Sequence, residues 1–404
     1  MNSQQSAGQL LPELARYQRL FLTVGAVAGA ASVVGVFIDQ LQFFHSYLIA
    51  YMLVLGATLG CLALGMVHHL SGGAWGVVTG GSIGAASRVL PVLTVLFLPI
   101  FIGMPDLYHW THEDAVARDE ILQFKAPYLN TPFFVIRAIV YFAVWNAITY
   151  FLNAWSLEHE RTGDPYIARR MRMLSGGGLL AYGLTVTFAS MDWIMSLDPH
   201  WFSTIHGLLT IGGQGLTALA VLTIALAWFS RREPFKAMVK PAHFHDLGNL
   251  MLAFVMLWAY FSFSQYLIIY AGNLPEEITW YVRRLFTGWR VIGVLLVLFH
   301  FAVPFLLLLS RTLKREPQML VKMAYGIIVM RLIDGFWQVA PEHHRDGFVL
   351  SWLDMTLPVA LIATWIGCFI WQLRGRTMLP LHDPVVGASL RRSVEGAEHL
   401  GPAH

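Results

Sequence analysis

Residues 47–67 read YLIAYMLVLGATLGCLALGMV, a run without a single charged side chain. A helix needs about 20 mostly apolar residues to cross the hydrocarbon core of a membrane, so this run is long enough to do so. Ten segments of the chain have this apolar character, and we predict one membrane-spanning helix in each. They are residues 20–38, 47–67, 89–104, 132–155, 174–196, 204–229, 246–270, 287–310, 318–340 and 352–373. The third segment is short, and we expect its helix to begin within the glycine-rich stretch 72–88.

The composition of the whole chain agrees with a lipid environment. Of its 404 residues, 56% are hydrophobic and only 13% are charged, whereas a soluble domain carries about 25% charged residues. The predicted fold class is therefore an all-α integral membrane protein with about ten transmembrane helices. We expect a tail at residues 1–19, a membrane domain at 20–373 and a second tail at 374–404, with residues 1–15 and 377–404 extended.

The distribution of Lys and Arg predicts the orientation of these helices. The loops on the side of the two termini hold 19 basic residues, Arg88 and Lys322 among them, whereas the loops on the other side hold 5. Basic residues are enriched in cytoplasmic loops, so both termini are predicted to be cytoplasmic. The chain has no run of basic residues that would indicate nucleic-acid binding.

Several ionisable side chains fall inside the predicted helices. Each costs about 2.5–3.5 kcal/mol at the centre of a membrane, so such residues are functional candidates. Arg331 and Asp334 are three residues apart and can pair with each other, either as a structural pair or within a transport path. The candidates for a proton path are Asp192, His206, Arg290, His300, Arg331, Asp334 and Asp354.

Two of these candidates have a second interpretation. Asp192 lies about one turn from the end of its helix, where it either exchanges protons or anchors a loop. His206, Thr210 and Gln214 form a stripe along one helix face. Such a stripe usually mediates helix packing, and in a minority of proteins it conducts protons.

One predicted helix is unusually polar and aromatic for a membrane. Its side chains either line a quinone pocket or a water path, or form hydrogen bonds with neighbouring helices, and we favour the hydrogen bonds. The residues concerned are Tyr260, Ser264, Gln265 and Tyr266. The sequence predicts no catalytic residue and no metal site.

The cysteines indicate how electrons could be carried. The chain has two, Cys61 and Cys368, both inside apolar segments, which predicts small buried hydrophobic residues. It contains no CxxCH haem attachment motif and no cysteine cluster. We therefore expect no covalently bound cofactor, and haem or iron–sulfur chemistry would have to come from partner chains.

Two stretches carry a resemblance to a known family. Residues 188–207 read FASMDWIMSLDPHWFSTIHG, and residues 264–289 read SQYLIIYAGNLPEEITWYVRRLFTGW. Together with the ten-helix layout, they resemble the ActF membrane subunits of bacterial alternative complex III, a quinol:cytochrome c oxidoreductase. These subunits belong to the NrfD/polysulfide-reductase group, and the resemblance covers essentially the whole chain.

The resemblance implies an architecture, a location and partners. The architecture is two four-helix bundles of inverted topology, helices 2–5 and 6–9, flanked by helices 1 and 10. The location is the bacterial cytoplasmic membrane, and the donor is menaquinol or another quinol. The implied partners are a sister subunit of the same fold, called ActC, and subunits on the external face that carry haem c and iron–sulfur clusters. A role in proton movement is also implied.

Two other functional classes compete with this interpretation. A secondary transporter would also have inverted repeats and charged residues near the membrane midplane, but it would need paired Gly- or Pro-broken helices in its two halves. The sequence has no such pair at matching positions. A self-sufficient quinone enzyme would need an electron acceptor of its own, which the sequence does not provide.

Overall fold

The computed structural model describes residues 3–233, 235–345 and 347–375, and all regular elements in these ranges are helices. The first half contains α1 (Ser3–Ile38), α2 (Gln40–Ser71), α3 (Ala74–Ser87), α4 (Leu90–Val95), α5 (Leu98–Ile102), α6 (Met104–Leu107), η1 (His109–Thr111), α7 (Glu113–Arg118), α8 (Glu120–Lys125), α9 (Thr131–Thr162), α10 (Pro165–Trp193) and η2 (Met195–Leu197). The second half contains α11 (His206–Phe229), α12 (Phe235–Met238), α13 (Pro241–Gly272), α14 (Pro275–Leu285), α15 (Arg290–Leu295), η3 (Leu296–Ala302), α16 (Val303–Leu309), α17 (Arg311–Arg315), α18 (Pro317–His343) and α19 (Leu353–Arg374).

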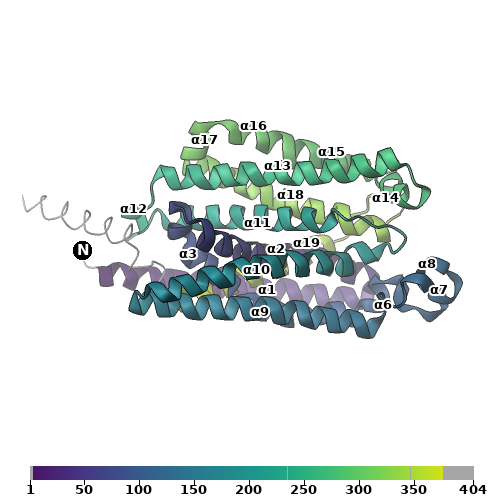
Figure 1. Cartoon of the computed structure of the whole chain (residues 1–404), viewed down its shortest axis with the longest axis horizontal. Coiled ribbons are helices and arrows are strands. Elements are labelled where there is room, and N and C mark those ends of the chain that lie inside the picture. Colours follow the sequence, from purple (N-terminus) through teal and green to yellow (C-terminus); the bar gives the residue numbers. More distant parts are fainter. Residues whose placement is uncertain (1–2, 234, 346, 376–404) are drawn as a thin grey trace, which may run out of the picture.

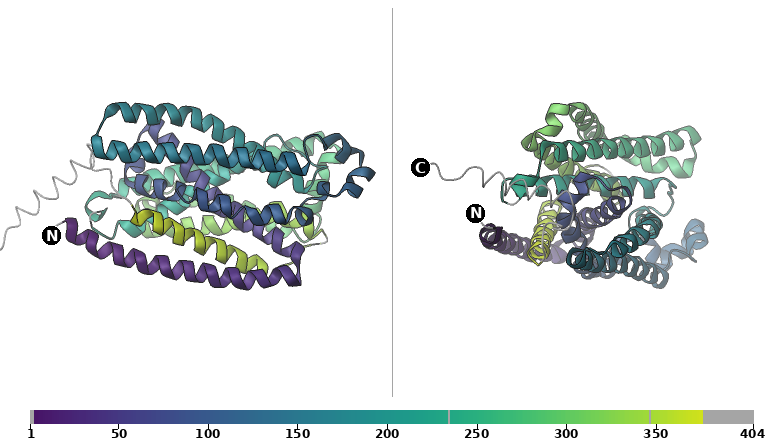
Figure 2. Two further views of the ribbon diagram at one scale, coloured as in Figure 1. Left: turned by 90° about the horizontal axis from the view of Figure 1, so that it is seen from below. Right: turned by 60° about the vertical axis from the view of Figure 1, so that its left-hand side comes forward.

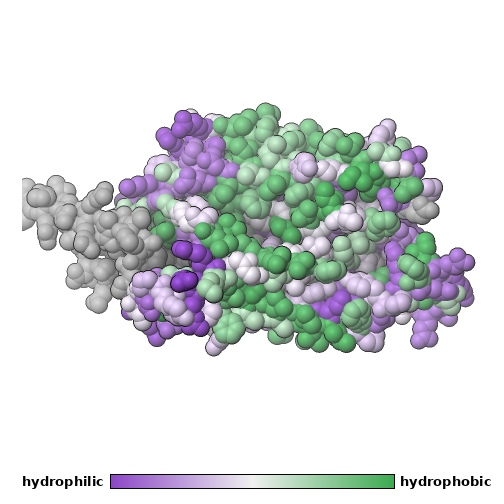
Figure 3. Space-filling model, viewed as in Figure 1, coloured by the Kyte–Doolittle hydropathy of each residue, from purple (hydrophilic) through white to green (hydrophobic). Residues whose placement is uncertain are grey.

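The long helices run side by side along the long axis of the molecule (Figure 1). Within the described residues, nine helical segments are long and apolar enough to cross a membrane. In the space-filling view, hydrophobic residues cover the middle of the molecule and hydrophilic residues gather at its two ends (Figure 3). This distribution is the one that a bilayer requires, because apolar side chains face lipid and polar side chains face water at both surfaces.

One predicted membrane helix is more polar than the other nine. The segment predicted at 318–340 is present as α18, which is 27 residues long but is not among the nine apolar segments. It carries Lys322, Arg331 and Asp334, and these charges lower its hydropathy. The helix expected to begin in the stretch 72–88 does so, since α3 to α5 form one apolar segment from Ala74 to Ile102.

Several features of the structure differ from the sequence-based expectation. The prediction of an extended N-terminal tail is wrong, because α1 already begins at Ser3. Within this first part of the helix, Leu14 is buried. Arg88 was assigned to a loop, yet it caps α3 inside the third membrane segment. It is accommodated there because its guanidinium donates to Asn153 Oδ1 at 2.7 Å and to the main-chain oxygen of Gln372 at 3.0 Å. The C-terminal tail, 377–404, lies outside the described residues.

Lys322 was also counted among the loop residues, and it lies inside α18 instead. Its side chain is exposed, so the long aliphatic stem can carry the ammonium group toward the membrane surface.

The two ends of the bundle differ in the elements that they hold. We call the end at which α1 begins the basic end; it also holds α12, α17 and the turn between α9 and α10 (Figure 1). At that turn α9 ends on Gly163 with φ of 65°, a left-handed conformation that favours glycine, and Asp164 caps α10. We call the opposite end, which holds α7, α8 and α14, the far end (Figure 1).

Helix α2 lies at the centre of the bundle. In its most apolar window 89% of the residues are buried, compared with 17% in α1, so α2 is surrounded by protein while α1 is largely exposed. It packs against α3, α10, α11, α18 and α19, and α1 packs along α19 (Figure 2). Gly60 allows the contact with α11, because a Cβ there would lie 2.7 Å from the carbonyl carbon of Gln214.

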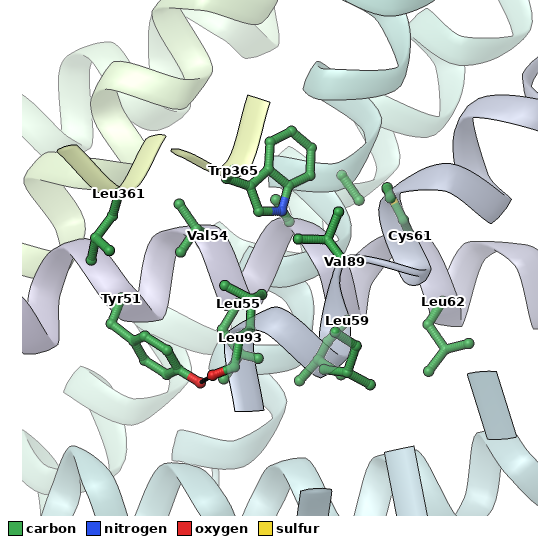
Figure 4. Close-up of a cluster of buried hydrophobic side chains, with 14 of the residues drawn as sticks. Tyr51, Val54, Leu55, Leu59, Cys61, Leu62, Val89, Leu93, Leu361 and Trp365 are labelled. Atoms are coloured by element: carbon green, nitrogen blue, oxygen red, sulfur yellow. Dashed lines mark hydrogen bonds between the residues drawn. The ribbon is translucent and has the colours of Figure 1, made fainter. Parts of the chain in front are cut away.

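Hydrogen bonds from buried aromatic side chains tie α2 to its neighbours. Tyr51 donates to the carbonyl oxygen of Leu93 at 2.8 Å, a bond that is visible in Figure 4. Trp365 of α19 donates to Thr58 at 2.8 Å. Cys61 is fully buried in the same cluster, as predicted, whereas Cys368 is only partly buried.

The first prediction concerns the two ends of the bundle. In a chain with Cys61→Ala and Cys368→Ala, single cysteines at Glu113 and Lys236 should react with impermeant maleimides from opposite sides of the membrane. Both native side chains are exposed, Glu113 in α7 at the far end and Lys236 in α12 at the basic end. A cysteine at Arg311 is the control and should behave like the one at Lys236. If the cysteines that replace Glu113 and Lys236 were labelled from the same side of the membrane, the transmembrane arrangement would be contradicted.

Candidate functional site

A small cavity, which we call the polar cavity, lies between α2, α11 and α18; polar side chains line part of it, and apolar side chains such as Ile49, Met52 and Val339 line the rest. Its volume is about 40 Å³, which leaves room for roughly three water molecules at about 10–15 Å³ each. Polar side chains of α11 and α18 line it, and glycines of α2 and α18 leave the space open. These lining residues are Thr210, Gln214, Thr217, Arg331, Gln338, Gly56 and Gly335. Because the polar groups can hold water by hydrogen bonds, we treat the cavity as hydrated.

Arg331, which lines this cavity, forms an ion pair with Asp334, as their spacing on α18 predicted. Gln338, one turn further on, donates to the same oxygen of Asp334 at 3.0 Å. The Nε of Arg331 is buried and has no hydrogen-bond partner among the residues that the structure describes. Since Arg331 lines the cavity, water there can accept from Nε and relieve the cost of an unsatisfied buried donor.

The position of Arg331 depends on a glycine of α11. A Cβ on Gly213 would collide with the guanidinium group of Arg331. Only a residue without a side chain therefore allows the guanidinium group to lie against α11. The sequence contained Gly213 within an apolar segment, and nothing in its spacing identified this role.

The predicted stripe along α11 reaches the cavity. Thr210 and Gln214 line it, and Gln214 accepts a hydrogen bond from Tyr182 of α10 at 2.7 Å. Thr210 donates to the main-chain oxygen of His206 at 3.0 Å. His206 is 1% exposed, and within the described part of the chain neither of its ring nitrogens has a hydrogen-bond partner. The stripe thus combines a packing contact, at Gln214, with a buried imidazole one turn from the cavity.

His300 is a second buried imidazole, and neither of its ring nitrogens has a hydrogen-bond partner in residues 3–233, 235–345 and 347–375. It lies in η3, a π-helical segment, four residues before Pro304. Proline has no N–H to bond the carbonyl of residue 300 and its ring clashes with that carbonyl, which favours a widened turn there. The ring of His300 lies 4.0 Å from that of Trp258, and its charge would interact with that of Arg331.

Asp192 belongs to a separate and fully paired group. Arg137 of α9 donates to its two carboxylate oxygens at 2.8 and 2.9 Å, and Tyr141 donates to it at 2.8 Å. The remaining Nη1 of Arg137 donates to the main-chain oxygen of Tyr128 at 2.8 Å. The carboxylate is 0% exposed and does not line the cavity. This geometry favours the anchoring role for Asp192 over proton exchange.

The other two candidates for the proton path lie elsewhere. Asp354 begins α19, where it accepts from Ser46 at 2.6 Å and from Gln42 at 3.0 Å, so it joins α19 to the start of α2. Arg290 is the first residue of α15 and is exposed. Neither residue lines the polar cavity around Arg331.

The four residues proposed to line a quinone or water path do not share one surface. Gln265 is buried and accepts from Ser203 at 2.9 Å, whereas Tyr260 is 64% exposed on the outside of α13. Ser264 and Tyr266 are half-buried. Gln265 also donates to the hydroxyl group of Tyr281 in the neighbouring helix α14 at 3.3 Å, which agrees with the hydrogen bonds to neighbouring helices that we favoured from the sequence.

The two sequence stretches that carry the family resemblance meet at the far end. Trp201 and Trp280 stack with ring centroids 4.7 Å apart, and Asp198 pairs with Arg283 at 3.3 Å. Arg284 is fully buried and donates to the carbonyl oxygen of Trp337 at 2.9 Å. Burial lowers its pKa to about 10. By position Arg284 falls between the predicted helices 246–270 and 287–310, and only tertiary packing buries its side chain against α18.

Arg137 and Asp192 generate a prediction about stability. Asp192→Asn keeps the side-chain volume but leaves Arg137 buried without a counter-ion, so the free energy of unfolding should fall by about 3–5 kcal/mol. Unfolding in a sodium dodecyl sulfate titration measures this loss. The control is Asp119→Asn: the pair of Asp119 with His200 is partly exposed, so we expect a loss below about 1 kcal/mol. Equal losses in both variants would contradict a structural role for Asp192.

The comparisons with known proteins add no family assignment. The chain matches no protein-family model, and no curated protein matches its sequence. What can be concluded about function therefore depends on the sequence stretches and on the buried polar groups described above.

Proposed function

We propose that the chain is a membrane subunit of a quinol-oxidising electron-transfer complex of the alternative complex III type, and that its polar cavity is part of a proton path. The single observation that carries the proposal is the group of ionisable side chains around this cavity. Arg331 lines it, Asp334 pairs with Arg331, and His206 lies one turn from it. Ionisable residues around a hydrated cavity inside a membrane protein are typical of ion and proton pathways.

The cavity is of the right size for water and protons. An apolar cavity of about 150 Å³ is known to bind benzene, whereas this one measures about 40 Å³. A proton moves along hydrogen bonds and needs no more space than a few water molecules. The unpartnered ring nitrogens of His206 and His300 could extend such a path, since imidazole both donates and accepts protons.

The same volume argues against a secondary transporter. A transported solute must enter a binding site at the interface of the two halves of the protein. The polar cavity between α2, α11 and α18 admits only water-sized species. We therefore retain the transporter only as an alternative for a small cation.

The remaining parts of the proposal follow from the resemblance. Haem c and iron–sulfur clusters would belong to partner subunits, a sister subunit of the ActC type would lie alongside, and menaquinol or another quinol would be oxidised in the complex. The contacts of α2 with α3 and α10, and of α9 with α10, fall within helices 2–5 of the implied first bundle, and the contacts of α11 with α13 and α18 fall within helices 6–9 of the second. Because Lys and Arg are enriched in cytoplasmic loops, the basic end would face the bacterial cytoplasm and the far end would face the external subunits.

Co-purification tests the membership in a complex. When the affinity-tagged chain is isolated in mild detergent from its native membrane, we expect c-type haem absorption and quinol:cytochrome c reductase activity to accompany it. After separation from its partners the chain should be colourless, because it has no CxxCH motif and only two cysteines. Purification as a single chain without haem proteins would contradict the proposal.

Asp334→Asn tests the proton path. The variant removes a titratable group with little change in volume, and the cavity lets water solvate Arg331 in its place. In the complex reconstituted into vesicles, we expect the rate of proton movement to fall roughly tenfold, which corresponds to about 1.4 kcal/mol in the barrier to proton transfer. Quinol oxidation in detergent and haem content should stay unchanged.

The matched control for this experiment is Asp354→Asn, a buried carboxylate outside the cavity. It should leave the rate of proton movement at the wild-type value wherever the complex assembles with its full haem content. Unchanged proton movement in the Asp334 variant would reject the path through this cavity.

A further inference from the structure

An apolar groove of about 520 Å³ runs along one side of the bundle. Helices α1 and α19 form one wall, α11 and α18 form the other, and α2 contributes three residues. Apart from Thr217 and tyrosine hydroxyl groups, the lining side chains are aliphatic or aromatic. Tyr325 lines the groove and is 55% exposed, so the groove opens to the outer surface of the bundle, where lipid lies.

The groove is elongated along the helices. It extends from Leu14 and Leu373 near the basic end to Leu53 and Thr217 near the middle of the chain's membrane region. Leu53 and Thr217 also line the polar cavity, so the inner end of the groove touches the wall of that cavity. A molecule in the groove would therefore separate the polar cavity from the bilayer on this side.

The chemistry of the lining selects a hydrocarbon chain. Water would find almost no hydrogen-bond partners in the groove, and an empty groove would forfeit the dispersion contacts of its walls. A quinone could place its tail in the groove only if its ring fitted at one end. The polar cavity at the inner end measures about 40 Å³, too small for a ring when benzene occupies a cavity of about 150 Å³.

Basic side chains surround the outer end of the groove. Arg232 lies over the ring of Trp228, with Cζ 3.5 Å from the ring centroid, and pairs with Glu13 at 2.9 Å. Arg374 directly follows Leu373 and donates to the neutral amide oxygen of Gln18 at 2.6 Å.

Lys322 adds a third basic group at this end. It is exposed and lies one turn from Tyr325, which lines the groove. The three basic groups thus outnumber the single carboxylate, that of Glu13. This excess of positive charge favours a negatively charged phosphate at this end.

We infer that the groove is a specific lipid site that holds one acyl chain of an anionic phospholipid, with its phosphate next to Arg374 and Lys322. Apolar contact along the groove selects the chain, and the basic groups select the charge of the head group. Trp228 and Tyr17 line the groove, and amphipathic aromatic rings are favoured at the level of the lipid head groups in membrane proteins. This inference does not depend on the proposed role in quinol oxidation.

Photocrosslinking of the full chain tests the site. The chain is reconstituted in phosphatidylcholine vesicles that contain phosphatidylglycerol with a diazirine in its acyl chain. We expect crosslinks on α1, α11 and α19. Val221→Trp fills the groove, so these crosslinks should fall roughly tenfold, as the indole excludes the chain. The matched control is Val291→Trp on α15, which is 61% exposed outside the groove and should leave the crosslinks unchanged.

A second variant tests the head group and does not alter the groove itself. Lys322→Gln with Arg374→Gln should bring labelling by the anionic lipid down to that by phosphatidylcholine carrying the same diazirine. Three results would overturn the inference: unchanged crosslinks in the Val221→Trp chain, equal labelling of the wild type by both lipids, or displacement of the lipid by a ubiquinone analogue.

Discussion

Hydrocarbon cannot solvate a charge, and this constraint determines how three arginines of the bundle, Arg137, Arg284 and Arg331, are held. Arg137 is saturated by a carboxylate and a carbonyl oxygen. Arg284, near the far end, is bound by main-chain oxygens and by Glu342. Arg331 is different, because its carboxylate partner leaves Nε without a protein acceptor beside a small cavity. The first two arrangements are closed and structural, while the third leaves room for water and therefore for proton transfer.

The cavity exists because small residues lie on three central helices. Gly60 brings α2 close to α11, and Gly213 admits the guanidinium group of Arg331. Gly56 and Gly335 then leave the space that the cavity occupies. Close helix contact and an internal cavity thus have the same origin, the absence of side chains at positions where backbones face each other.

Local backbone chemistry places the second imidazole. Pro304 interrupts the hydrogen-bond pattern of its helix, and the π-helical segment that precedes it contains His300 against Trp258. Widened turns of this kind are frequent at functional sites, because they redirect a side chain without ending the helix. The result is an imidazole held inside the bundle near the Arg331–Asp334 pair but bound to neither residue.

The sequence by itself determined the apolar helices and the contacts within one helix. Long apolar runs predicted the nine membrane segments and α18, since the thickness of the membrane sets their length. Arg331 and Asp334 were predicted to pair because residues three apart share a helix face. The positions of residues along the chain were sufficient to predict both the apolar helices and the pairing of Arg331 with Asp334.

Only the tertiary structure decided which helix faces meet. Arg137 and Asp192 are 55 residues apart, and the stretches that contain Trp201 and Trp280 are separated by two long helices. No periodicity along the chain encodes these pairings, because they depend on the packing of side chains from different helices. For the same reason the sequence could not separate Asp192, which is fully paired, from Asp334, which lies beside a cavity.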